Sequence, residues 1–148
     1  MPKRLRRLSA HDLSLLLEAW ALFWTARLAV IVLPFRWMRP VLGRTGAESP
    51  ATVPDPILAR ARRIGWAVVR VSQLLPSSRG TCLAQAIAAQ TMLRRRGIAA
   101  TVYLGVARKD GEKLAAHAWV RSGEVILTGR PGHRRFNVLT SFAADRSN

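Results

Sequence analysis

The apolar residues of this chain change their spacing at Gly97, and this change constrains the fold more than any other feature. Before Gly97 they recur every three or four positions, which is typical of helices. After it they form short runs between turn residues, which indicates strands. The pattern predicts helices at 9–33, 56–75 and 81–97, and strands at 98–107, 114–121 and 124–128. Helices followed by an antiparallel meander belong to the α+β class.

Turn residues separate the expected strands, at 109–112 and at Ser122-Gly123, and residues 137–142 are expected to form one more short element. With 148 residues the chain is long enough for one domain, or for one domain with an accessory segment. We divide it into an N-terminal helical segment at 1–45, a surface linker at 46–56 and a core at 57–148.

The single cysteine, Cys82, stands at the start of the helix predicted at 81–97. Thr81 is a good N-cap residue and Gly97 a good C-cap residue, so the thiol is expected on the first helical turn. There the helix dipole and the free backbone N–H groups favour the nucleophilic thiolate.

A histidine, His117, lies 35 residues later inside an apolar strand. An imidazole on a sheet that packs against the helix can reach the sulfur of Cys82, and the two side chains then form a nucleophile and its base. The backbone N–H of Cys82 can help to bind an oxyanion. Taken singly, each residue also fits a purely structural role in the core.

Composition excludes several classes of protein. One cysteine rules out an internal disulfide framework and suits a reducing compartment, so we expect a cytoplasmic protein. One cysteine and three scattered histidines provide no zinc-binding pattern, and we expect neither a metal nor another cofactor. The net charge of +16 is spread along the chain without a nucleic-acid-reading motif, so we expect acidic peptide or protein partners rather than nucleic acid.

The first predicted helix follows a basic start and is strongly apolar. Glu18 and Arg27 interrupt its apolar stretch, which favours a helix buried by the rest of the protein. Two alternatives stay open, namely contact with a membrane surface and a true membrane span.

These motifs together resemble the leader peptidases of lasso-peptide biosynthesis, within the transglutaminase-like, papain-related superfamily. The resemblance covers nearly the whole chain, and its specific parts surround Cys82 and His117. The matching blocks are Cys82–Ala86, Leu93–Ile98, Leu104–Val106 and Ala116–Val120, with weaker likeness at Leu15–Ala19 and Leu33–Arg36.

The resemblance implies a transglutaminase-like or papain-like core, in which a nucleophile helix packs on a small antiparallel sheet. It implies a cytoplasmic cysteine protease that removes the leader of a ribosomally made precursor peptide. A separate ATP-dependent macrolactam cyclase would act next. Because no leader-binding domain fits ahead of Ser9, we expect a separate leader-recognition protein. A non-catalytic interaction module and another acyl-transfer enzyme, such as an amidase or transglutaminase, remain alternatives.

The third catalytic group departs from the family, which usually has an aspartate on the strand after the histidine. Here that strand offers only Glu124, beside the turn. If Ser122-Gly123 forms a two-residue turn, Thr128 stands opposite His117 and can orient the imidazole. Asn137 and a backbone carbonyl near Gly129 are the alternatives.

Two further residues are candidates for substrate binding. Trp119 shares a strand face with His117, so it either walls the active site or packs in the core. Gln85 lies one helical turn after the thiol and can donate to an oxyanion, or it is simply a polar surface residue.

Overall fold

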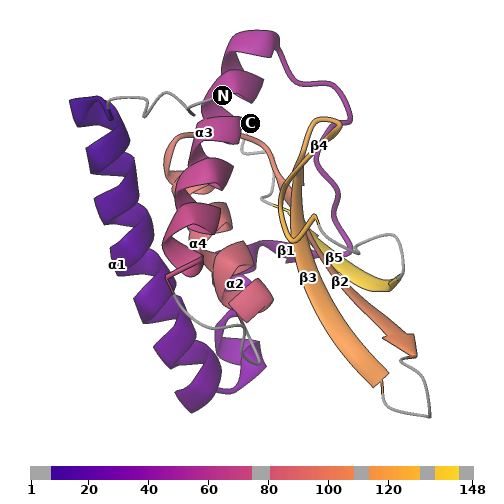
Figure 1. The fold of residues 1–148 in the computed structure, drawn as a ribbon. Coiled ribbons are helices and arrows are strands. Elements are labelled where there is room, and N and C mark those ends of the chain that lie inside the picture. Colours follow the sequence, from indigo (N-terminus) through magenta and orange to yellow (C-terminus); the bar gives the residue numbers. More distant parts are fainter. Residues whose placement is uncertain (1–7, 75–80, 109–113, 131–135, 144–148) are drawn as a thin grey trace.

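The computed structural model describes residues 8–74, 81–108, 114–130 and 136–143. Its helices lie on one side of the sheet that its strands form, as Figure 1 shows. This arrangement confirms the α+β class predicted from the sequence. The predicted turn at 109–112 lies outside the described residues. The elements in chain order are α1 (Ala10–Val32), η1 (Phe35–Trp37), α2 (Arg39–Leu42), β1 (Arg44–Thr45), α3 (Asp55–Ser72), α4 (Thr81–Arg95), β2 (Thr101–Arg108), β3 (Leu114–Ser122), β4 (Val125–Thr128) and β5 (Asn137–Ala143).

Local capping sets the helix ends. The Ser9 side chain accepts from the Asp12 backbone N–H while the Asp12 carboxylate accepts from the Ser9 N–H, which is a capping box at the start of α1. At the other end α1 stops at Leu33, directly before Pro34. Gly97 has a φ of +68° after α4, and the Ile98 N–H donates to the Leu93 carbonyl. Gly97 therefore ends α4 as predicted.

The sheet has the order β1-β5-β2-β3-β4, and all its pairs are antiparallel. Only β2, β3 and β4 form the expected meander. The chain then crosses back, so that β5 pairs with β2 and carries β1 at its other edge. The short element predicted at 137–142 is therefore an inner strand of the sheet rather than a tail.

The turn between β3 and β4 lies one residue later than predicted, at Gly123-Glu124. Ser122 is buried and donates its hydroxyl to the Ala99 carbonyl, which keeps it in β3. Gly123, with a φ of +56°, takes the turn position instead. A register shift then follows between Val120 and Arg121, and Thr128 pairs with Val120 rather than with His117.

The residues predicted as a surface linker are attached to the sheet. Asp55 and Pro56 already belong to α3. Ahead of them, the Ser49 N–H donates to the Thr101 hydroxyl, and Arg121 donates to the Ser49 carbonyl. These hydrogen bonds hold the segment around Ser49 against the sheet.

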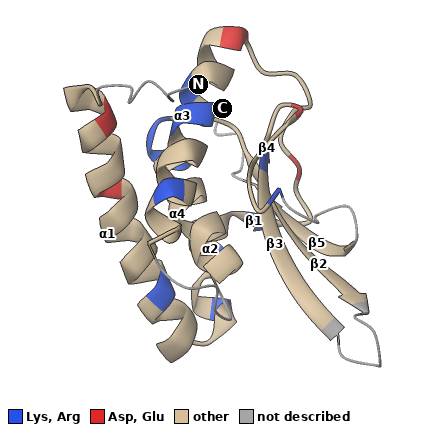
Figure 2. Ribbon diagram, viewed as in Figure 1, with Lys and Arg blue, Asp and Glu red and all other residues tan. Residues whose placement is uncertain are grey.

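Helix α1 packs on α3 and α4, and its buried residues join the same core as theirs. Glu18 of α1 accepts hydrogen bonds from Arg95 and Arg96 at the end of α4, at 3.1 and 2.6 Å. The hydrogen bond from Arg96 holds the pKa of Glu18 below its ordinary value, against the opposing effect of burial. Asp12 forms a second ion pair, with Arg63 of α3. Figure 2 shows both acidic positions on α1.

Among the described residues, α1 is the one helix whose length and composition would let it cross a membrane, although core helices and N-terminal signal sequences share those properties.

Candidate active site

Cys82 is the second residue of α4 and is partly exposed. Thr81 belongs to the helix, so it is not the N-cap residue that we predicted. The thiol still lies on the first turn, where backbone N–H groups have no acceptor within the helix. The Thr81 hydroxyl accepts a hydrogen bond of 3.3 Å from Arg27, which links α1 to this end of α4.

The His117 ring lies on β3 and is held from three sides. It stacks on Phe136, with ring centroids 4.9 Å apart, and on Trp119, with centroids 5.8 Å apart. Its Nε2 lies 2.6 Å from the carbonyl oxygen of Gly129. Because a carbonyl can only accept, Nε2 must be the protonated nitrogen. A neutral ring in this tautomer carries its lone pair at Nδ1, where a base needs it.

Gly129 directs its carbonyl at His117 through a backbone conformation that favours glycine. Its φ is +72°, in the left-handed region. A Cβ at this position would meet the Ala118 carbonyl and would lie 2.8 Å from the Cβ of Trp119. Gly129 therefore allows the end of β4 to pass close enough to β3 for the hydrogen bond to form.

A second glycine makes room for the aromatic rings. Gly105 of β2 pairs with His117 across the sheet. A Cβ on Gly105 would lie 2.9 Å from the Trp119 ring and 3.0 Å from the Cβ of Phe136. The stack of Trp119, His117 and Phe136 thus depends on the absence of a side chain at Gly105.

Cys82 and His117 line one cleft of about 710 Å³. The cleft lies between α3, the start of α4 and the strands β3 and β4, within the size range of about 300–1,000 Å³ for ligand sites. Its walls also include Trp66 and Val69 of α3 and Leu127 of β4.

Comparison with protein families matches residues 29–141 to the transglutaminase-like superfamily. The match covers most of the chain, including Cys82, His117 and every strand of the sheet up to Ser141. The chain belongs to the transglutaminase-like superfamily. No curated protein and no solved structure matches it. Cysteine-dependent enzymes are common in this superfamily, and they include peptidases and acyltransferases.

Of the three orienting groups considered for this transglutaminase-like site, the Gly129 carbonyl is the one that contacts His117. Thr128 is buried, and its hydroxyl oxygen has no hydrogen-bond partner among the described residues. Asn137 is exposed and pairs with Val106, and no described hydrogen bond joins its side chain to His117. The expected register of Thr128 was wrong because the turn and the register shift displaced β4.

The two substrate-binding candidates differ in position. Gln85 lines the cleft, and its amide donates to the Ser72 hydroxyl at 2.6 Å. Ser72 in turn donates to the Val69 carbonyl, so Gln85 is held toward α3. Trp119 is only 5% exposed and stacks between Tyr103 and His117. Trp119 therefore supports the imidazole from the core side and does not line the cleft.

Sequence reasoning missed Phe136 and Trp66. Trp66 of α3 is 40% exposed and lines the cleft, and no local pattern in the sequence marks it as part of a site. Phe136 precedes β5, whose place beside β2 was not foreseen. A glycine inside a predicted strand, Gly105, was the one signal of a close approach there.

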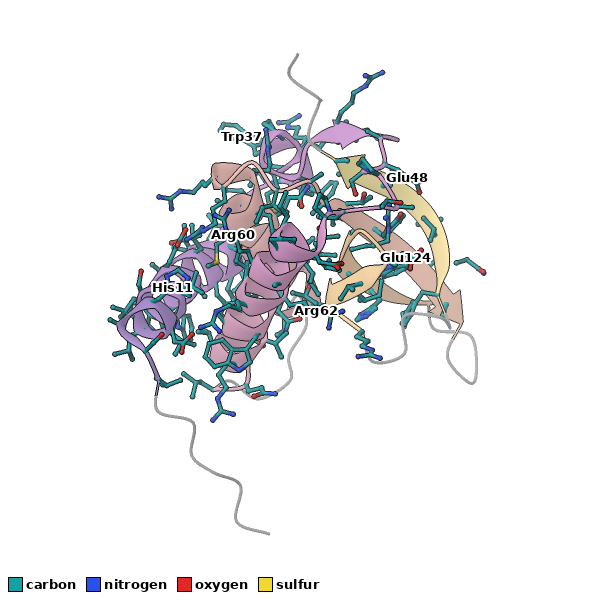
Figure 3. All side chains as sticks on the ribbon, turned by 90° about the horizontal axis from the view of Figure 1, so that it is seen from above. His11, Trp37, Glu48, Arg60, Arg62 and Glu124 are labelled. Carbon is teal, nitrogen blue, oxygen red and sulfur yellow. The ribbon has the colours of Figure 1, made fainter. Side chains whose placement is uncertain are left out.

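The described lining of the cleft carries positive charge. Arg62 and Arg130 are exposed at its edge, and none of its described residues is acidic. Figure 3 shows Arg62 on the side of α3 that faces β4. Within the described part of the chain, no group of three or more His, Cys, Asp or Glu side chains could hold a metal ion. His133, one of the three histidines of the chain, lies outside that part.

Proposed function

We propose that this transglutaminase-like protein is a cysteine peptidase that removes the leader from a ribosomally made lasso-peptide precursor. The observation that carries the proposal is that Cys82, on the first turn of α4, shares a cleft with an imidazole whose ring is fixed. A nucleophile and a base that line the same cleft are the minimum that thiol-dependent peptide cleavage needs.

In the first step His117 takes the thiol proton at Nδ1, and the Cys82 sulfur attacks the carbonyl carbon of the scissile peptide bond. The carbonyl oxygen becomes an oxyanion, which the backbone N–H of Cys82 stabilises at the start of α4. The C–N bond then breaks, and His117 returns its proton to the departing amine. This leaves a thioester between Cys82 and the leader.

In the second step His117 removes a proton from water, and the resulting hydroxide attacks the thioester. The C–S bond breaks, the leader leaves with a new carboxylate, and the thiol recovers its proton. Throughout, the Gly129 carbonyl keeps Nε2 protonated and stabilises the imidazolium as a neutral dipole, which is weaker than a carboxylate.

The substrate would be acidic near the cleavage site. Arg62 and Arg130 lie at the edge of the cleft, and the whole chain carries a net charge of +16. Such a field steers acidic peptides toward the site and raises their association rate. The apolar walls from Trp66 and Leu127 would receive the side chains beside the scissile bond.

The lasso-peptide assignment rests on the resemblance of the blocks around Cys82 and His117, and it brings three partners with it. These are the precursor peptide, a separate leader-recognition protein that holds the leader, and an ATP-dependent macrolactam cyclase that uses the released core. All of them would meet this chain in the cytoplasm.

The chemistry can be tested without knowing the substrate, because Cys82 is the single thiol in the chain. Iodoacetamide should alkylate it rapidly at neutral pH, and His117→Ala should slow the reaction. His11→Ala is the matched control, since His11 is exposed on α1. Equal alkylation rates for the two histidine variants would refute the pairing.

The substrate assignment needs a second experiment. A precursor peptide encoded beside this gene is incubated with the enzyme and the leader-recognition protein, and the masses of its products are measured by mass spectrometry. We expect one cut between leader and core, lost in Cys82→Ala. Amide formation to an added amine, without hydrolysis, would instead identify an acyltransferase. An unmodified peptide despite rapid alkylation of Cys82 would refute the leader-peptidase assignment.

A further inference from the structure

The paired charged side chains of α1 face the protein, whereas one side of the helix presents large apolar side chains to solvent. Asp12 pairs with Arg63 of α3, and Glu18 pairs with Arg95 and Arg96 at the C-terminal end of α4. Arg27 donates to Thr81 at the start of α4. Figure 2 shows the charged positions of α1 and the long uncharged stretches between them. A helix on the surface of a soluble protein usually has the opposite arrangement.

The outward side of α1 forms a continuous apolar strip, which we call the outer stripe. Its residues follow one another at spacings of three or four, so they lie on one face of the helix. The exposed fractions run from 40% to 71%: Leu13 50%, Leu17 69%, Trp20 53%, Trp24 40%, Leu28 64% and Ile31 71%. The buried residues of α1 (Leu15, Ala19, Phe23 and Ala26) lie on the other side, against α3 and α4.

The apolar surface continues past both ends of the outer stripe. At its C-terminal end it takes in Val32 and Leu33, which are 64% and 41% exposed, and Trp37 beyond α1 is 62% exposed. Near the start of α1 a groove of about 640 Å³ runs between the helix and the end of α3, where Leu74 is 74% exposed. Contiguous apolar surface of this extent marks an interaction site rather than ordinary surface.

Charge around the outer stripe indicates what covers it. No acidic residue occurs between Glu18 and Glu48, whereas Arg36 and Arg39 follow α1 and are exposed. Four basic residues precede α1 in the sequence, within residues 3–7. Two of the six stripe residues are tryptophans, a side chain that favours the boundary between lipid headgroups and acyl chains. Basic flanks around such a face are complementary to anionic lipid.

Other arrangements are less favourable. A second copy would bring another +16 charge against the first. A membrane span would draw Asp12, Glu18 and Arg27 away from their partners and into hydrocarbon, which is costly. We therefore propose that α1 lies flat on an anionic membrane surface, with the outer stripe at the headgroup–acyl boundary.

This docking leaves the catalytic cleft open to solution. None of the described residues that line the cleft belongs to α1. In Figure 1 α1 stands at one edge of the molecule, with α3 and α4 between it and the sheet. Most residues of the outer stripe also precede position 29, where the superfamily match begins. Membrane binding and cleavage can thus be measured separately.

The test is flotation with vesicles of phosphatidylcholine, with and without phosphatidylglycerol. Leu17→Glu is compared with Leu139→Glu on β5, because the two leucines are 69% and 67% exposed and both changes add one negative charge. We expect wild type and Leu139→Glu to bind the anionic vesicles equally. Leu17→Glu should bind at least about tenfold more weakly, because a carboxylate replaces a leucine at the membrane boundary.

A second measurement uses the intact wild type. Brominated lipid in anionic vesicles should quench the tryptophan fluorescence, and Trp20→Phe with Trp24→Phe should remove most of that quenching. Equal vesicle binding by the Leu17 and Leu139 variants would overturn the proposal. The proposal would also be overturned if the wild type did not bind vesicles and instead used this face to form a dimer or to bind the leader-recognition protein. In either case Leu17→Glu would disrupt that association. Cleavage of free precursor is expected to survive Leu17→Glu.

Discussion

Replacing Gly129 by alanine tests the contact on which the proposed chemistry depends. The carbonyl of Gly129 accepts from His117 only because β4 ends close against β3. An alanine Cβ would meet the Ala118 carbonyl and would lie 2.8 and 2.9 Å from the Cβ and Cα of Trp119. These are backbone and Cβ atoms, so a rotamer change cannot relieve the overlap. The chain must move, and the carbonyl moves with it.

The expected loss of stability has two parts. Alanine at a φ of +72° costs about 1–2 kcal/mol. The overlap with β3 adds about 1–3 kcal/mol, as for other overpacked sites. The total of about 2–5 kcal/mol lowers the melting temperature by roughly 5–15 °C for a chain of this length. A displacement of about 1 Å at the carbonyl should also slow cleavage by roughly 10- to 100-fold.

Gly97→Ala is the matched control. Gly97 has a φ of +68°, but nothing lies within 4 Å of the Cβ that alanine would add. The Gly97→Ala variant should therefore lose only the stability that the positive φ costs alanine, about 1–2 kcal/mol, and it should keep its activity. Calorimetry would measure both melting temperatures, and iodoacetamide would measure the reactivity of Cys82. Equal melting temperatures and equal alkylation rates in the two variants would show that the Gly129 carbonyl does not hold His117.

Three further outcomes are expected. Glu18→Gln should lower the free energy of unfolding by about 1–2 kcal/mol at pH 7, because Arg96 holds the pKa of Glu18 down in the folded state. That difference should vanish in urea titrations as the pH falls through the folded-state pKa of Glu18, which lies below the ordinary glutamate value, and a constant difference down to pH 2 would contradict it. Thr128→Val should be neutral or stabilising by up to about 1 kcal/mol and should keep its cleavage rate, because the hydroxyl has no described partner; a large loss of rate would restore Thr128 as the orienting group. Gln90→Leu should cost about 2–3 kcal/mol in the same urea assay, because the carbonyls of Leu42 and Ala100 lose their buried donor, and unchanged stability would show that these bonds contribute nothing.

Some features of the fold were predictable because their causes are local. The capping box of Ser9 and Asp12 begins α1, and Gly97 ends α4, through contacts within a few residues of each other. The same local rules placed Cys82 on the first turn of its helix. The short apolar run at 114–121, which turn residues bound, placed His117 in a strand.

The orienting group of His117 was not predictable from local patterns. The position of Thr128 depends on a one-residue change of the turn and on a register shift, and Ser122 determines the turn through a hydrogen bond to Ala99. Such a contact between distant segments leaves no periodic signal in the sequence. A backbone carbonyl is present at every residue, so no residue type could mark Gly129 as the partner of His117.

The sequence by itself determined the class of fold, the helix that carries the thiol and the strand that carries the imidazole. Only the tertiary structure decided which groups surround that imidazole. Phe136 reaches it because β5 crosses back to pair with β2, and Trp119 supports it because Gly105 leaves space. The outward apolar face of α1 was decided in the same way. Its helix is apolar on both sides, so only the position of α3 and α4, and of the arginines that pair with Asp12 and Glu18, determines which side is buried.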